Sequence, residues 1–205
     1  MTKIERREQI LNAAITAFNE QGFAAVTMDL IAKTAATSKR TIYQLYADKN
    51  DILKDLLYYT GDKTVEAFGG IEIPAGPTGE ALLATARRMF EICMGEELIC
   101  MTRLLTSEAK EYSDHARVVI HRSNSEIVRV VKRYISKKIE IGEFIDEDPE
   151  ILAELFVYPI IAMIERQYHA QIKDPANVEE IDHWLTACVR FYIRGCAAHS
   201  GVEAP

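Results

Sequence analysis

The sequence lacks the features that mark exported, membrane-spanning and metal-binding proteins. Only four of its 205 residues are cysteine, and none lies in a CxxC motif or at a zinc-binding spacing. The opening MTKIERREQ has no apolar segment of a secretory signal, and the longest apolar run, residues 155–164, is far too short to span a membrane. We therefore expect reduced thiols, a cytoplasmic location, no membrane association, and no metal or cofactor.

Motifs of the common enzyme classes are also missing. The chain has no HExxH, P-loop or GxGxxG sequence, and its five histidines lack metal-ligand spacing. Ser113, Asp114 and His115 are the residue types of a hydrolase triad, but neighbours in one helical turn cannot converge on one substrate atom. We therefore expect no enzymatic activity. The alternatives are a small helical enzyme, a metal- or redox-sensing protein that uses His or Cys residues of the C-terminal part, and an interaction domain without a DNA role.

Helical periodicity is present almost throughout, and no segment shows convincing strand alternation. The clearest break is the Gly- and Pro-rich segment 69–79. A first helix is expected over residues 3–21, a second from Thr27, and a third from Ser38 to about Tyr46. The sequence therefore predicts an all-α protein of about nine helices, with a three-helix N-terminal head followed by a C-terminal helical domain.

Charge is distributed unevenly between these two parts. The net charge of the chain is −7, which alone argues against a nucleic-acid binder. Residues 1–54, however, hold 8 Lys and Arg against 6 Asp and Glu, whereas residues 55–205 hold 16 against 25. A small basic head on an acidic body is typical of a protein whose head faces DNA.

The segment 27–53, TMDLIAKTAATSKRTIYQLYADKNDIL, predicts a helix-turn-helix. Small residues at Ala32, Ala35 and Ala36 allow two short helices to cross closely, and the second helix of such a motif enters the major groove. Ile42 and Leu45 are its expected buried positions. The remaining polar side chains of the second helix are left for DNA.

Residues 10–53 resemble the DNA-binding domain of the TetR family of bacterial transcriptional regulators. Residue type and spacing match at Ile10, Leu11, Ala14, Phe18, Gly22, Phe23, Thr27, Ile31, Ala32, Ala35, Ser38, Thr41, Tyr43, Tyr46, Lys49 and Leu53. Two positions depart from the family pattern. Ala36 replaces a frequent Gly of the turn, which predicts a residue at positive φ. Tyr46 replaces a frequent Phe, and its hydroxyl must find a partner.

The resemblance implies a regulator of transcription that binds double-stranded operator DNA. The expected DNA-binding residues are Thr27, Ser38, Lys39, Arg40, Thr41, Tyr43, Gln44, Tyr46 and Lys49. In the family, positions matching Thr27, Tyr43 and Lys49 contact the phosphate backbone. Arg40 and Gln44 are suited to read bases, because Arg pairs with guanine and Gln with adenine through two hydrogen bonds.

The resemblance also implies that residues 1–54 are the DNA-binding domain and that residues 55–205 bind a small effector and form a homodimer. Two helices near the C-terminus are apolar over more than one face and need partners on two sides. The expected interface residues are Leu155, Ile160, Ile164, Trp184, Cys188, Phe191 and Tyr192. Two such helices from each subunit would form a four-helix interface, and its C2 symmetry would match a palindromic operator.

The effector site is predicted from Met and aromatic residues, which adapt to varied apolar ligands. Its candidates are Phe90, Met94, Met101, Leu105, His121, Tyr134, Phe156, Tyr158 and Met163. Plain core packing is the competing interpretation for each of them. The expected activity is repression that ends when a small, apolar or aromatic effector binds the C-terminal domain, and the sequence does not identify that effector.

Overall fold

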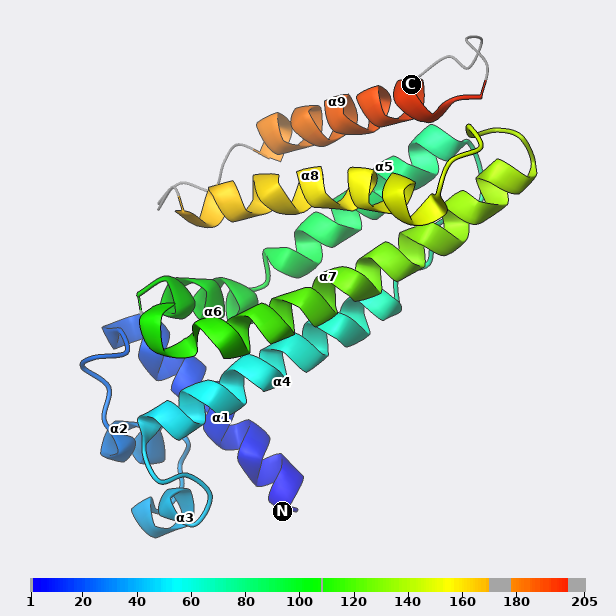
Figure 1. The fold of residues 1–205 in the computed structure, drawn as a ribbon. Helices are drawn as coiled ribbons and strands as arrows, with labels where there is room; N and C mark the ends of the chain where they lie inside the picture. Colours follow the sequence, from blue (N-terminus) through cyan, green and yellow to red (C-terminus); the bar gives the residue numbers. More distant parts are fainter. Residues whose placement is uncertain (1, 108, 170–177, 199–205) are drawn as a thin grey trace. The chain divides into compact units, whose positions relative to one another are not determined.

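The computed structural model describes residues 2–107, 109–169 and 178–198, and most of this part is α-helical (Figure 1). The helices are α1 (Lys3–Gln21), α2 (Met28–Thr34), α3 (Lys39–Tyr43), α4 (Lys49–Gly69), α5 (Thr78–Cys93), α6 (Glu96–Ser107), α7 (Ala109–Glu140), α8 (Pro149–His169) and α9 (Val178–Cys196). The prediction of an all-α fold with about nine helices is therefore confirmed. None of the described helices is long and apolar enough to cross a membrane.

Local sequence signals set the ends of the first helices. The side chain of Thr2 accepts a hydrogen bond from the Glu5 amide, and the Glu5 carboxylate accepts one from the Thr2 amide, which forms a capping box. Gly22 ends α1 with φ at 75°, a conformation that favours glycine. The third helix ends at Tyr43, earlier than the expected Tyr46, because Gln44 is already its C-cap.

The backbone divides into two compact units. One comprises residues 1–62 and 96–120, and the other comprises residues 63–95 and 121–205. The first unit therefore contains α6 and the beginning of α7 in addition to the helix-turn-helix. The predicted functional boundary at residue 54 lies within α4, and α4 contributes residues to both units.

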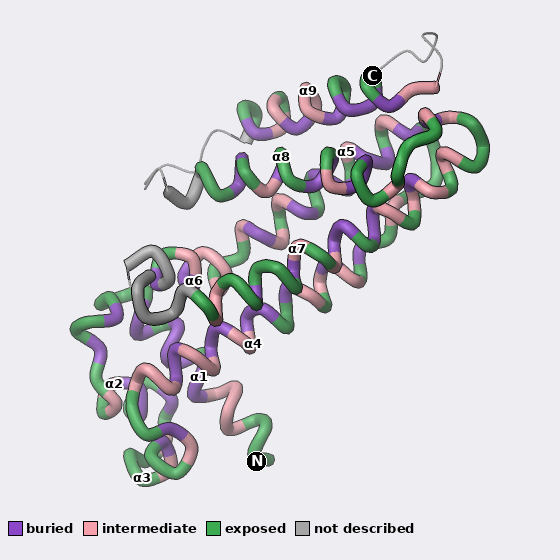
Figure 2. The backbone as a smooth tube through the Cα atoms, viewed as in Figure 1, coloured by how far each residue is buried: buried purple, intermediate pink, exposed green. Residues whose placement is uncertain are grey.

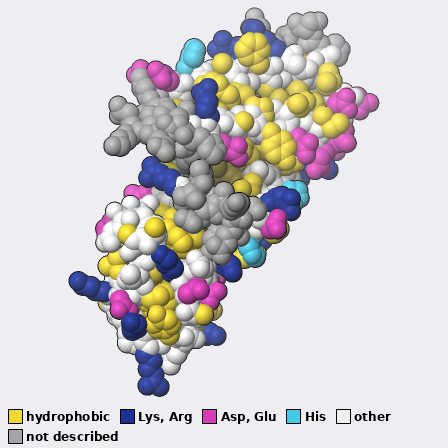
Figure 3. Space-filling model, turned by 60° about the vertical axis from the view of Figure 1, so that its left-hand side comes forward, with side chains coloured by type: hydrophobic (Ala, Val, Ile, Leu, Met, Phe, Trp, Pro, Cys, Tyr) yellow, Lys and Arg dark blue, Asp and Glu magenta, His cyan; other side chains and the backbone are white. Residues whose placement is uncertain are grey.

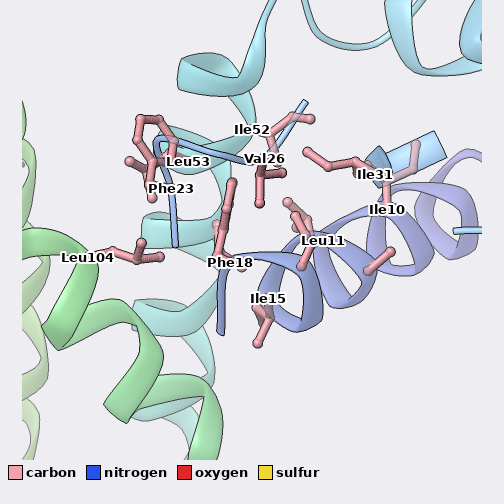
Figure 4. Packing of buried hydrophobic residues seen from close by; sticks show 14 of the residues in the cluster. Ile10, Leu11, Ile15, Phe18, Phe23, Val26, Ile31, Ile52, Leu53 and Leu104 are labelled. Carbon is pink, nitrogen blue, oxygen red and sulfur yellow. The ribbon is translucent and has the colours of Figure 1, made fainter. Parts of the chain in front are cut away.

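Buried apolar residues from α1, the following loop, α2, α4 and α6 form the core of the first unit. Figure 4 shows Leu11 and Phe18 of α1 on the side that faces Val26, Ile52 and Leu53, and Ile10 beside Ile31. Phe18 and Phe23 pack with ring centroids 5.2 Å apart. Because α6 supplies buried residues such as Leu104, the short helices α2 and α3 rest on a core larger than the head could form by itself.

In the second unit, α5, α8 and α9 pack against one another. Each helix shows a buried stripe and an exposed face in Figure 2. Phe156 of α8 is fully buried, and its ring meets that of Tyr192 of α9 at a centroid distance of 5.3 Å. The Ile145 amide donates a hydrogen bond to the Cys196 carbonyl at 2.8 Å, which ties the loop after α7 to the end of α9. These contacts hold α8 and α9 side by side.

Candidate nucleic-acid interface

The turn between α2 and α3 has the geometry of a helix-turn-helix. The Ala35 amide donates to the Ile31 carbonyl at 2.8 Å, and the Thr37 amide donates to the Ala32 carbonyl at 3.0 Å. Ala36 has φ of 46°, as its position in the turn predicts. A non-glycine residue costs about 1 kcal/mol in this left-handed region. The two hydrogen bonds of the turn therefore offset the strain at Ala36.

Only one side chain of α3 is buried. Ile42 is fully buried, whereas Lys39, Arg40 and Tyr43 are exposed, and so is Gln44 directly after the helix. Figure 3 shows Lys and Arg side chains projecting at the lower end of the view, where Figure 1 places α3. The helix thus presents donors and a phenol to solvent along most of its surface, which suits a helix that enters a DNA groove.

The predicted contacts at the helix starts act as caps. Thr27 accepts a hydrogen bond from the Leu30 amide at 3.2 Å, and Ser38 accepts one from the Thr41 amide at 3.1 Å. The hydroxyls of Ser38 and Thr41 are also bonded to each other at 2.7 Å. Thr27 and Ser38 remain exposed. Capping therefore fixes their orientation and leaves them accessible to a phosphate.

Lys39 carries an ion pair with Asp29 across the motif. Its Nζ lies 2.7 Å from the Asp29 carboxylate, and both side chains are more than half exposed. The hydrogen bond that Lys39 donates to Asp29, and then the charge of Asp29, raise the pKa of Lys39. An exposed pair of this kind contributes little to stability. Lys39 can therefore exchange this carboxylate for a phosphate at small cost.

Lys49 has a different environment from the one expected of a phosphate contact. Its Nζ donates to the carbonyls of Phe23 at 2.8 Å, Ala24 at 3.1 Å and Val26 at 3.1 Å. The same ammonium lies 4.6 Å from the centre of the Phe23 ring. An ammonium group has three donors, and here all three are used. Lys49 ties the loop after α1 to the start of α4.

Tyr46 is also bound within the protein. Its side chain is buried, and its hydroxyl donates to Asp55 Oδ2 at 2.6 Å. Asp55 also receives two hydrogen bonds from Arg7, from Nε at 2.8 Å and from Nη2 at 2.6 Å. Neither Arg7 nor Asp55 was expected from the sequence. In the sequence, the only indication of this pair is that a charged residue stands on the inward face of each of the two helices, α1 and α4.

An apolar groove lies on the second unit, between α8 and α9. It has a volume of about 640 Å³ and is lined by Ile145, Glu147, Ile151, Leu152, Leu155, Pro159, Trp184, Ala187, Cys188, Phe191, Tyr192, Gly195 and Cys196. Leu155 is 58% exposed and Phe191 is 75% exposed. Of the expected interface residues, Leu155, Trp184, Cys188 and Phe191 thus lie at this surface. Ile160 and Ile164 are instead buried inside the unit, and Tyr192 is buried as well although it lines the groove.

Comparison with known proteins identifies the family. The model of the bacterial regulatory proteins of the TetR family matches residues 10–56, and that of the AefR-like transcriptional repressor C-terminal domain matches residues 80–196. The chain belongs to the TetR family. It is 30% identical over 166 residues to YhgD, an uncharacterised helix-turn-helix transcriptional regulator of Bacillus subtilis (strain 168), covering 78% of this chain and 83% of that protein.

Solved structures of TetR-family regulators share the fold. A regulator from Mesorhizobium loti MAFF303099 superposes with a TM-score of 0.80 at 21% identity, covering 96% of this chain and 100% of the other. The flavonoid-responsive regulator FrrA superposes with a TM-score of 0.68 at 21% identity, covering 94% and 97%. The family matches over residues 10–56 and 80–196, together with the similarity to YhgD, make this TetR-family chain a DNA-binding transcriptional regulator.

The predicted effector residues of this TetR-family chain do not share one environment. Phe156 and Met163 of α8 are buried, and Phe156 packs on Tyr192. Phe90 and Met94, at the end of α5, are half-buried. All four lie in the second unit, where a site for an apolar effector was expected.

The other candidates are more scattered. Tyr134 is half-buried, whereas Tyr158 and His121 are exposed. Met101 belongs to the core of the first unit. The side chain of Leu105 lies outside the described residues. The effector site therefore stays a prediction, and α5 and α8 carry its best-placed members.

The alternatives based on Cys or His chemistry gain no support from the geometry. Burial raises the pKa of Cys93 to about 12 and that of Cys100 to about 11. It also raises the pKa of Cys188 and Cys196. Thiols with raised pKa values react poorly because the thiolate is the nucleophile and the metal ligand. In the part of the chain that the structure describes, no three His, Cys, Asp or Glu side chains are grouped to hold a metal.

Proposed function

We propose that this regulator binds a palindromic operator as a homodimer and represses transcription until a small effector binds residues 55–205. One observation carries the proposal. The five-residue helix α3 buries Ile42 alone and leaves Lys39, Arg40, Tyr43 and the adjacent Gln44 exposed. A helix with one anchoring side chain and a polar surface has little use in a core, and its surface chemistry suits DNA.

The exposed residues divide by chemistry into base-reading and backbone-binding groups. Arg40 has the paired donors that match guanine, and the amide of Gln44 matches adenine. Tyr43 and Lys39 are suited to phosphate oxygens, as are the capping hydroxyls of Thr27 and Ser38 and the half-buried Thr41. We leave Tyr46 and Lys49 out of the contact set, because their polar atoms are bound within the protein.

The groove between α8 and α9 supports a dimer. Ile151, Leu155 and Phe191 are exposed and Trp184 and Cys188 are half-buried, so together they offer an accessible apolar surface on two adjacent helices. The same surface on a second subunit would complete a four-helix interface around a twofold axis. The two recognition helices of such a dimer would then read half-sites about one turn of DNA apart, which is why we expect a palindrome.

The effector is proposed to be small and apolar or aromatic. Phe90, Met94, Phe156 and Met163 supply the aromatic and thioether groups for such a site. A regulator of this kind acts where the DNA is, in the cytoplasm. Flavonoids are a suitable first class of probe, because the structural neighbour FrrA is named as responsive to them.

Selection of DNA from a random library by the purified protein tests the operator. We expect enrichment of a palindrome, retarded as a complex with two subunits per duplex. A promoter that carries this palindrome should yield less transcript when the protein is added. Recovery of no preferred sequence, or of a preferred sequence that leaves transcription unchanged, would contradict the proposal.

Titration with candidate effectors tests release. A ligand that acts allosterically should weaken operator binding by a coupling of about 1–3 kcal/mol, which is roughly 5- to 150-fold in Kd. The variant Phe156→Ala should lower the affinity for the ligand, whereas Ile141→Ala, at an exposed position of the same unit, should not. A ligand that binds with no effect on operator affinity would contradict the switch.

A further inference from the structure

The recognition helix α3 cannot hold its own position. It has only five residues, and isolated helices shorter than about 12 residues are marginal in water even with favourable sequences. Ile42 is its one fully buried side chain. The direction in which Arg40 and Gln44 point must therefore depend on contacts at the two ends of the helix.

A three-residue hydrogen-bond network lies just beyond the C-terminal end of α3. Tyr46 follows the helix and donates from its hydroxyl to Asp55 Oδ2 at 2.6 Å. Arg7 of α1 donates to both oxygens of the same carboxylate, at 2.8 and 2.6 Å. Because Asp55 belongs to α4, the network joins α1, α4 and the segment after α3. This pairing of an arginine with both carboxylate oxygens fixes geometry as well as energy.

The protonation states of Asp55 and Tyr46 preserve the hydrogen bonds of the network. Burial would raise the pKa of Asp55, but the hydrogen bonds from Arg7 and Tyr46 and the charge of Arg7 lower it below the usual value. Burial raises the pKa of Tyr46, and the bond to Asp55 raises it further. Tyr46 therefore stays a hydrogen-bond donor, and Asp55 stays an ionised acceptor, across the physiological pH range.

The other end of α3 is tied to the same helix. Gln9 of α1 donates from Nε2 to the Ala35 carbonyl at 2.7 Å, at the turn that precedes α3. Gln9 lies two residues after Arg7 on α1. The first helix thus contacts the turn before α3 through Gln9 and the segment after α3 through Arg7 and Asp55.

We propose that Asp55 is a positioning residue for sequence-specific DNA binding, acting on the recognition helix through Tyr46. Neither residue touches DNA in this role. The hydroxyl of Tyr46 forms the link between the segment after α3 and Asp55, so its hydrogen bond carries the positioning effect. The inference rests on the proposed function, because it requires a preferred operator.

Two conservative variants test the inference. Tyr46→Phe removes one hydroxyl and keeps the buried ring, and Asp55→Asn removes the charge without changing the size. Tyr58→Phe is the matched control, because its hydroxyl bonds to His115 at 2.7 Å in the same unit without touching the network. Operator affinity, affinity for scrambled duplex and thermal midpoint are measured for each variant, with binding recorded well below every midpoint.

We expect Tyr46→Phe and Asp55→Asn each to weaken operator binding roughly tenfold, with affinity for scrambled duplex unchanged or higher. Removing the negative charge of Asp55 should by itself strengthen the general attraction of the head to DNA. A loss of operator affinity in Asp55→Asn would therefore come from the lost positioning and not from the change in charge. The double variant should lose little more than one single variant, because both changes break the same bond. Tyr58→Phe should retain wild-type operator affinity.

Two results would overturn the inference. Unchanged operator affinity in both variants, with lowered thermal midpoints, would make the network purely structural. Equal losses on operator and scrambled duplex would make Tyr46 a direct backbone contact. Failure of the wild-type protein to prefer any sequence would instead refute the proposed function, and the inference with it.

Discussion

Replacement of Lys49 by methionine separates two roles for this lysine, a phosphate contact and an internal tie. The variant keeps most of the aliphatic chain and removes the ammonium that donates to the carbonyls of Phe23, Ala24 and Val26. Hydrogen bonds to a charged group contribute about 1.5–3 kcal/mol each. The bond to Ala24 is exposed and those to Phe23 and Val26 are only partly buried, so water can replace part of the lost bonding and we expect a net loss of about 2 kcal/mol.

For a chain of this size, a loss of about 2 kcal/mol lowers the thermal midpoint by roughly 4–8 °C. The assay pairs thermal unfolding with operator titrations at several salt concentrations. A phosphate contact contributes about 0.9 to the slope of log K against log salt, so two subunits would contribute roughly 1.8. We expect Lys49→Met to lower the midpoint and to leave this slope unchanged.

Lys33→Met is the matched control. Lys33 is an exposed lysine of α2, so its replacement removes the same charge from the head without breaking the carbonyl ties. We expect its thermal midpoint to match that of the wild type. A Lys49→Met variant with a wild-type midpoint and a slope reduced by roughly 1.8 would refute the internal role and restore the phosphate contact.

Three further outcomes follow from the geometry. Phe191→Glu should reduce the free energy of dimerisation, measured by sedimentation, by about 3–6 kcal/mol, because two exposed rings are lost per dimer. Val118→Glu, at an exposed position outside the groove, should leave the dimer intact. Denaturant titration should show wild type more stable than Asp55→Asn, with the largest difference in the free energy of unfolding above about pH 5. This difference should shrink as the pH falls through the lowered pKa of Asp55, because the carboxylate becomes protonated. A difference that does not change with pH would contradict the ionised role of Asp55. Cys93 and Cys100, with pKa values of about 12 and 11, should resist thiol reagents at pH 7 until the protein unfolds, and rapid native labelling would refute their burial.

Local signals in the sequence were enough to predict much of the head. Thr27 and Ser38 cap their helices and Gly22 ends the first helix as residue type and spacing indicate, and Ala36 adopts the positive φ that the family resemblance implied. These features depend on residues within a few positions of each other along the chain. Helical periodicity is equally local, which explains why the all-α fold was predicted correctly.

Long-range polar partners could not be predicted in the same way. Arg7 and Asp55 are 48 positions apart, and periodicity does not say which charged side chains of two helices will meet. The sequence required a partner for the Tyr46 hydroxyl and left its identity open. Lys49 was expected at the DNA surface because composition alone cannot reveal three backbone carbonyls within reach of its ammonium.

The apolar face of the C-terminal helices shows the same limit. Periodicity marked α8 as apolar nearly all round, but it could not distinguish residues such as Ile160, which face the unit's own core, from residues such as Leu155, which face solvent. That distinction depends on which neighbouring helix each face meets. The same reason leaves a pocket and a packed core indistinguishable for Phe156 and Met163.

The central claim is that exposed side chains of α3 read the operator, and a base-by-base affinity profile of Arg40→Ala tests it most directly. The profile compares wild type, Arg40→Ala and Arg133→Ala, an exposed control in the second unit, on every single-base variant of the selected operator. We predict that Arg40→Ala loses about 1–3 kcal/mol per half-site and loses discrimination at one base pair, while Arg133→Ala keeps the wild-type profile. A uniform loss at all positions, or no loss at all, would contradict the claim.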